Sequence, residues 1–186
     1  AGRIRIPNDS KSRAGGVLYS DYSLGRFFAE AARQPWFENT IFLVTADHCA
    51  SSAGRTEIPL QKYHIPALIL APGLIEPGVV DGIVSQIDLM PTLLSLLNMS
   101  YDSHFYGRSI FDPAYVNRAF IATYQDLGYL EGDTFTILSP VRRFEQYRVV
   151  PTEENPHHLE AMERKDAVQV DRAIGYYQTS CKWNKQ

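Results

Sequence analysis

Residues 41–48 constrain the fold more than any other part of the chain. They read Ile-Phe-Leu-Val-Thr-Ala-Asp-His, and the apolar, β-branched run predicts a strand buried on both faces. The strand would end at a carboxylate and an imidazole, Asp47 and His48. Functional groups of open α/β sheets collect at the carboxyl ends of strands, and an oxygen donor beside a nitrogen donor suits a divalent metal. The segment therefore predicts an α/β fold and half of a metal site; the alternative is a capping Asp beside a surface His.

Length, charge and cysteine content restrict the classes of protein that remain. A chain of 186 residues forms one domain, or one domain with an appendage. The net charge of −3 gives no sign of the positively charged surface by which proteins bind nucleic acid. No apolar run is long enough to cross a bilayer. The two cysteines, Cys49 and Cys181, lack metal-ligand spacing, so we expect free thiols. Cys49 follows His48 directly; it is either a third soft ligand or, as we expect, a small buried filler.

The first two thirds of the sequence alternate between helical and strand patterns. A polar loop over residues 8–16 precedes a predicted helix over 17–33, whose apolar residues form one stripe. A second buried strand is predicted over 65–71 and an extended segment over 83–87. Asp88 then begins a buried helix over 89–97 as its cap, a role worth about 1 kcal/mol.

The pattern changes at residue 118. Short strands are predicted over 119–123, 134–138 and 145–150, followed by a charged, helix-competent stretch over 155–165 and a final helix over 167–183. Some of these strands alternate apolar and polar residues, which is typical of an antiparallel sheet with one solvated face. We therefore expect an α/β domain with a mostly parallel sheet over 1–117 and a small antiparallel subdomain over 118–186.

Four motifs occur in a fixed order along the first part of the chain. They are YSDYSLGRFF at 19–28, WFENTIFLVTADH at 36–48, YHIPALILAPG at 63–73 and VSQIDLMPTLL at 84–94. This order resembles the C-terminal half of the sulfatase branch of the alkaline phosphatase superfamily, and within it the bacterial lipoteichoic-acid-synthase-type phosphoglycerol transferases. The resemblance covers residues 17–111, and residues 173–179 resemble a tail helix of the family.

The resemblance implies a fold and a partial site. The fold would be the C-terminal part of an alkaline-phosphatase-like sandwich, and Asp47 and His48 would ligate one divalent metal, Mn, Mg, Ca or Zn. The family's nucleophile and first acidic metal ligand lie in the N-terminal half, so we expect this chain to be a fragment that lacks them. Because two adjacent ligands hold a cation weakly, we expect the chain alone to be inactive.

The resemblance also implies a substrate, partners and a location. The parent enzyme would transfer phosphoglycerol through a covalent intermediate, or hydrolyse sulfate or phosphate esters, on a lipid- or glycan-linked substrate. It would act outside the cytoplasm, in the periplasm or cell envelope, and be anchored to the membrane. The partners expected for this chain are the missing N-terminal half and a second copy of itself. The alternative is a non-catalytic binding or assembly domain whose Asp-His pair is structural.

Four further sites carry two interpretations each. Arg55 and Lys62 either neutralise phosphate or sulfate oxygens or merely solvate a loop. His64 either binds substrate or is a packed, hydrogen-bonded histidine. The adjacent His157 and His158 form either a surface metal site or part of a solvated charged stretch.

Overall fold

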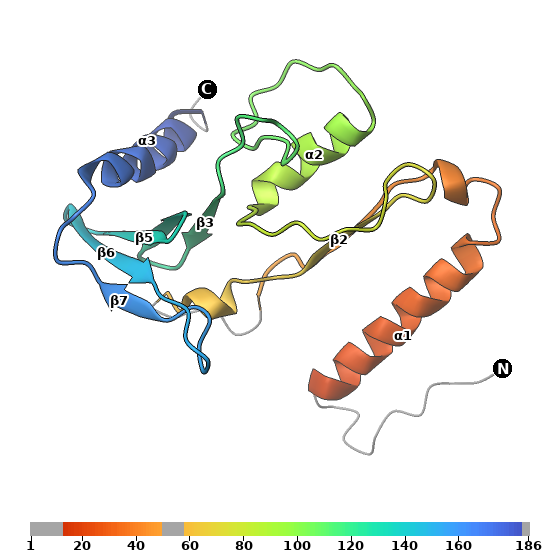
Figure 1. Ribbon diagram of the computed structural model, residues 1–186, viewed down its shortest axis with the longest axis horizontal. Helices are drawn as coiled ribbons and strands as arrows, with labels where there is room; N and C mark the ends of the chain where they lie inside the picture. The colour runs from red at the N-terminus through yellow and green to blue at the C-terminus, as the bar shows by residue number, and fades with distance from the viewer. Residues whose placement is uncertain (1–12, 50–57, 184–186) are drawn as a thin grey trace. The chain divides into compact units, whose positions relative to one another are not determined.

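The computed structural model describes residues 13–49 and 58–183 (Figure 1). In chain order its elements are α1 (Arg13–Ala31), η1 (Phe37–Asn39), β1 (Phe42–Thr45), η2 (Leu60–Lys62), β2 (Ala67–Leu70), η3 (Gln86–Asp88), α2 (Leu89–Leu96), β3 (Arg118–Ala122), β4 (Leu127–Glu131), β5 (Thr134–Ser139), β6 (Arg143–Val149), β7 (Leu159–Ala161) and α3 (Ala167–Trp183). They group into two compact units. The first unit holds the described residues up to Val44 together with Leu68–Gly78, and the second holds Thr45–Ala67 together with the described residues from Val79 onward.

An aromatic cluster organises the first unit. The ring of Phe42 on β1 contacts four other rings at centroid distances of 5.3–6.3 Å, from Phe27, Phe28, Trp36 and Phe37. The pairs with Phe27 and Phe28 are edge-to-face, an arrangement that adds to the stabilisation from burial of the rings. They fix the start of β1 against the C-terminal end of α1.

Helix α1 differs from its prediction in two ways. It begins at Arg13, within the stretch predicted to be a loop, and only Gly15 and Ala31 along it are buried. Much of the predicted apolar stripe is open to solvent, with Val17 63% and Phe27 49% exposed. The described part of the first unit offers little besides β1 and β2 to cover it, so an exposed apolar surface remains.

Strands β1 and β2 form at the predicted places but are not buried on both faces. Phe42, Leu43 and Val44 are only partly buried, and Leu68 on β2 is 56% exposed. Among the described strands, β1 and β2 pair only with each other. Each therefore keeps one unpaired edge, and no complete second layer covers them.

The second unit contains a five-stranded sheet in the order β3-β4-β5-β6-β7, and every neighbouring pair is antiparallel. The antiparallel C-terminal region is thus confirmed. The mostly parallel sheet expected over residues 1–117 is not confirmed, because the strands described there are β1 and β2 alone. The length of the connections explains the antiparallel order of β3–β7, since these strands follow one another through short links. Parallel neighbours would need crossover segments of a dozen or more residues.

Two strands of this sheet were not predicted. Strand β4 contains Gly128, which weakens a strand pattern but here packs against Phe135, where a Cβ would lie 2.8 Å from the ring. Strand β7 falls within the stretch 155–165 that was expected to favour a helix, so that expectation is wrong. Its three residues pair with the end of β6, where Leu159 lies opposite Val149.

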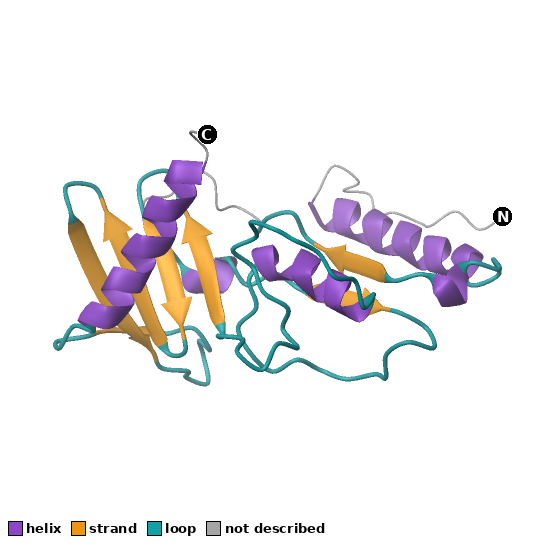
Figure 2. Cartoon of the chain, turned by 90° about the horizontal axis from the view of Figure 1, so that it is seen from above, coloured by secondary structure: helices purple, strands orange, loops and turns teal. Residues whose placement is uncertain are grey.

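Helix α3 lies along one face of this sheet (Figure 2) and contacts β4 and β5. Its bounds, Ala167–Trp183, agree with the prediction. A buried polar network fastens its first turn: Gln146 donates to Thr136 at 3.0 Å, and Thr136 donates to Gln169 at 2.9 Å. Because each of these buried groups has a partner, the network fixes the register of the helix on the sheet.

A buried ion pair joins the start of α2 to the sheet. Asp88 is 0% and Arg118 is 3% exposed, and two guanidinium nitrogens lie 3.0–3.2 Å from the carboxylate oxygens. The carboxylate also accepts hydrogen bonds from Ser85 N, Arg108 N and the Tyr115 hydroxyl at 2.9–3.1 Å. Asp88 stands at the N-cap position of α2, as predicted, but its side chain makes no capping hydrogen bond to that helix. The bond that it accepts from Ser85 N belongs to the capping box of η3.

The loop that reaches Asp88 requires a glycine. A Cβ on Gly107 would lie 1.8 Å from the carbonyl oxygen of Ile87. Only a residue without a side chain lets the backbone pass this close and place Arg108 N–H on the carboxylate.

The buried pair gives a stability prediction. Replacing Arg118 by Ala leaves the Asp88 carboxylate buried without its counter-charge, and we expect the free energy of unfolding to fall by about 3–5 kcal/mol. Urea unfolding followed by circular dichroism measures it. The control is Arg148→Ala, which removes a half-exposed pair with Asp133 and should cost at most about 1 kcal/mol. Equal losses in the two variants would contradict this assignment.

Candidate metal site

Asp47 and His48 lie just after β1, which ends at Thr45, and only Ala46 separates them from the strand. Their side chains are 86% and 76% exposed in the described structure. The prediction placed them at the end of a strand, and the structure does the same. Both side chains are therefore free to meet a ligand that approaches from solvent.

The hydrogen bonds of the turn set the direction of each donor atom. His48 Nδ1 lies 2.9 Å from the carbonyl oxygen of Cys49, and a carbonyl can only accept, so Nδ1 carries the ring proton. In the neutral form of the ring, the lone pair therefore lies on Nε2. Asp47 Oδ1 accepts from the His48 backbone N–H at 2.9 Å, while Asp47 Oδ2 lies 3.5 Å from His48 Nε2.

This donor set fits one divalent cation in part. A carboxylate oxygen and an imidazole nitrogen at this separation can both reach the same ion, with metal–ligand distances of about 2.0–2.2 Å. Across residues 13–49 and 58–183, no group of three or more His, Cys, Asp or Glu side chains is placed to hold a metal. Asp47 and His48 would thus supply two ligands, and further ligands would have to come from elsewhere.

Gln86 stabilises the backbone of the turn that carries Asp47 and His48. Its amide nitrogen donates to the carbonyl oxygens of Ala46 and Asp47 at 2.9 and 3.0 Å. Gln86 is the first residue of η3, two residues before the buried Asp88. The contacts that hold Asp88 in place therefore also position the Gln86 amide. The sequence analysis missed this role. Its only signal was the presence of Gln86 in the 84–94 motif, which does not reveal a partner 39 residues away.

The structure describes two of the three residues that were predicted to bind substrate, Lys62 and His64. Arg55 lies outside the described residues, and Lys62 is partly buried at the end of η2. His64 makes a contact that was not foreseen: its Nδ1 lies 3.3 Å from Nε2 of His157. Partial burial, and then the neighbouring His64, lower the pKa of His157. The structure thus pairs His157 with His64, while the ring of His158 is exposed.

Neither cysteine forms a disulfide. Cys49 and Cys181 are both free, as expected from their spacing. The expectation of a small buried filler holds for Cys49 only in part, because the residue is partly buried. Its carbonyl oxygen, which orients His48, is the group of this residue that the site uses.

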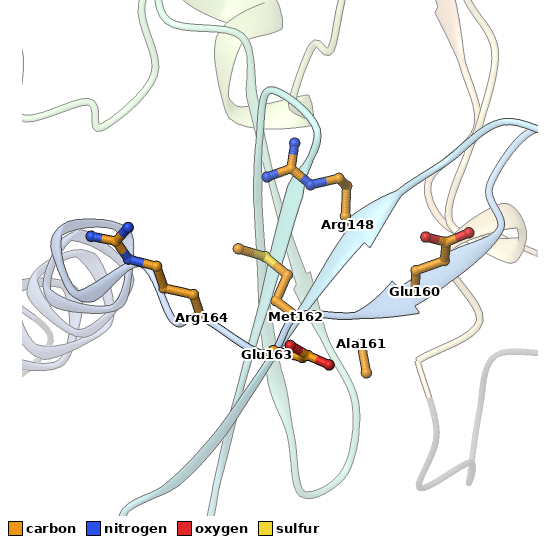
Figure 3. A pocket seen from close by; sticks show the side chains of 6 residues that line it. All are labelled: Arg148, Glu160, Ala161, Met162, Glu163 and Arg164. Atoms are coloured by element: carbon orange, nitrogen blue, oxygen red, sulfur yellow. The ribbon is translucent and has the colours of Figure 1, made fainter.

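A shallow hollow on the sheet edge is not a second candidate (Figure 3). It is lined by Arg148, Glu160, Ala161, Met162, Glu163 and Arg164, so charges of both signs surround it. Arg148 is already paired with Asp133 at 2.8 Å. None of the residues predicted to bind metal or substrate lines this hollow.

The chain is similar to a family model, to a known protein and to a solved structure. Residues 8–99 match the family model described as Sulfatase, a region that includes Asp47, His48 and Gln86. An arylsulfatase of Clostridium perfringens (strain 13 / Type A) is 30% identical over 107 residues, which are 53% of this chain and 22% of that protein. The crystal structure of a protein in the alkaline phosphatase superfamily from Vibrio parahaemolyticus is 30% identical, with a TM-score of 0.80 over 97% of this chain and 45% of that one.

The three similarities agree with one another. Together they support a relationship of this chain to the sulfatase and alkaline phosphatase superfamily, through an α/β fold. The chain spans less than half the length of both relatives. In the described part of the chain, none of the helices has the length and apolarity that a membrane span requires.

The tautomer of His48 is directly measurable. Because the Cys49 carbonyl accepts from Nδ1, long-range ¹H–¹⁵N spectra above pH 8 or so should show His48 protonated on Nδ1. The exposed His158 provides an internal comparison in the same spectrum. If His48 carried its proton on Nε2 instead, that nitrogen would not be available to a metal, and the site as described would be wrong.

Proposed function

We propose that this chain supplies Asp47 and His48 to the metal site of an enzyme that cleaves phosphate or sulfate esters. One observation carries the proposal: Asp47 Oδ2 and His48 Nε2 lie 3.5 Å apart and exposed, inside the region that matches the Sulfatase model. The comparisons support the relationship of the chain to the sulfatase and alkaline phosphatase superfamily. The roles of Asp47 and His48 as metal ligands, and the reaction, are proposed.

The roles of the residues follow from their contacts. Asp47 Oδ2 and His48 Nε2 would hold one divalent ion, Mn, Mg, Ca or Zn, and Gln86 would keep the turn in place through two backbone carbonyls. When bound, the ion supplies positive charge that stabilises the oxygens of the ester. Lys62 and Arg55 would add cationic groups that neutralise the same class of oxygen.

Two versions of the reaction have support. The order of the four motifs favours transfer of phosphoglycerol from a lipid- or glycan-linked phosphate ester. The similarity to an arylsulfatase favours hydrolysis of a sulfate ester. Both versions need a nucleophile and a further acidic ligand, which we propose lie outside these 186 residues. We therefore propose that the chain alone has no activity.

Partners and location form a separate part of the proposal. The longer protein would act in the periplasm or cell envelope while anchored to a membrane. Its remaining half would complete the site and cover exposed apolar residues of α1. In isolation, we propose that the chain pairs with a second copy through that surface, which light scattering would detect as a dimer; a monodisperse monomer would contradict this.

A non-catalytic function remains the competing proposal. In it, the Asp47–His48 turn is structural, because the turn is already stabilised by Gln86 and by its own hydrogen bonds. The two proposals differ in what a substitution of the ligand atoms does to turnover.

The test uses the full-length gene product, assayed with Mn²⁺ on p-nitrophenyl sulfate, p-nitrophenyl phosphate and phosphatidylglycerol. Asp47→Asn and His48→Gln should each lower turnover about 100-fold or more, because each removes a metal ligand. His158→Gln is the matched control and should retain activity. Undiminished turnover in the Asp47 and His48 variants would favour the structural interpretation, and turnover by the 186-residue chain alone would contradict its proposed inactivity.

A further inference from the structure

Two histidines far apart in the sequence meet in the second unit. His64 Nδ1 and His157 Nε2 lie 3.3 Å apart, the ring centroids are separated by 5.3 Å, and the ring planes are nearly perpendicular at 85°. Between two neutral rings this separation allows one hydrogen bond, in which one ring donates and the other accepts. The contact joins the segment before β2 to the loop before β7.

The hydrophobic core holds both segments in place. Leu60 is buried in the core cluster, and Tyr63, next to His64, packs against that cluster. Leu159, two residues after His157, packs against the same cluster. Both imidazoles are therefore attached to backbone that the core fixes.

Local hydrogen bonds brace the loop that carries His157. The backbone N–H of His157 donates to Asn155 Oδ1 at 2.9 Å, and Asn155 N donates to Thr152 Oγ1 at 3.0 Å. Val150 N donates to the carbonyl oxygen of His158 at 2.9 Å, next to the paired strands β6 and β7. The backbone that carries His157 thus has little conformational freedom left to lose when a ligand binds.

The separation of the two nitrogens also matches shared coordination. Two imidazole nitrogens on one tetrahedral Zn²⁺, each at about 2.0–2.1 Å, are about 3.3–3.4 Å apart. Imidazole suits Zn²⁺, whereas Mg²⁺ and Ca²⁺ prefer oxygen ligands. His64 is exposed and His157 is partly buried, so the pair is open to an ion from solvent.

We propose that His64 and His157 form a two-histidine Zn²⁺ site that links the segment before β2 to the loop before β7. His64 Nδ1 and His157 Nε2 each donate a lone pair, and water fills the remaining positions. The ring that donates in the His–His hydrogen bond moves that proton, through solvent, to its other nitrogen, so each neutral ring then carries one proton on the nitrogen that does not bind the ion. Binding thus exchanges the His–His hydrogen bond for two metal–nitrogen bonds without net proton release. Since no group of three potential ligands occurs among the described residues, the pair does not merge with Asp47 and His48.

Isothermal titration of the tag-free chain with Zn²⁺ at about pH 7.5 tests the proposal. Replacing either histidine, in His64→Gln or His157→Gln, should lower the Zn²⁺ association constant about tenfold or more. The neighbouring His158→Gln is the matched control and should bind as the unmodified chain does. The double variant Asp47→Asn/His48→Gln should also keep this binding, which separates the inference from the proposed function.

A second measurement on the unmodified chain does not depend on how the variants fold. Zn²⁺ should shift the ring ¹⁵N resonances of His64 and His157, while Mg²⁺ should leave them unchanged. Absence of Zn²⁺ binding would overturn the proposal. So would a loss of affinity confined to the Asp47/His48 double variant or to His158→Gln.

Discussion

The buried pair of Asp88 and Arg118 is the interaction on which the second unit depends. Removing two charges from water is costly, and the cost is offset only when every donor and acceptor finds a partner. Here the carboxylate meets a guanidinium, two backbone N–H groups and the Tyr115 hydroxyl, while Arg118 also donates to the Tyr106 carbonyl at 3.0 Å. Burial, together with the hydrogen bond that Tyr115 donates to Asp88, raises the pKa of Tyr115, so its hydroxyl stays a donor at neutral pH.

The same pair connects the sheet to the candidate metal site. Arg118 opens β3 and holds Asp88, Asp88 closes η3, and Gln86 at the start of η3 binds the backbone of Ala46 and Asp47. The turn that presents the two ligand atoms is thus tied to the sheet through one polar chain of contacts. An exposed site gains order in this way without being buried itself.

Local patterns predicted the elements whose signals are local. Helix α3, strands β1 and β2, helix α2 and three strands of the antiparallel sheet follow from apolar spacing and from turn residues. The patterns failed where pairing decides the outcome. Strand β7 has only three residues and forms because it pairs with the edge of β6. Strand β4 accommodates Gly128 because Phe135 fills the space that a side chain would occupy.

The candidate site shows the same division. The sequence by itself determined that Asp47 and His48 stand together after a strand, because adjacency along the chain places them there, and the motif order indicated their superfamily. Only the tertiary structure decided that Cys49 orients the His48 ring and that Gln86 braces the turn. It also decided that Asp88 binds Arg118 and that His64 contacts His157. Apart from the Cys49 contact, which depends on a local turn, these contacts join residues 30 or more positions apart. No periodicity encodes such partners, because packing of the core brings them together.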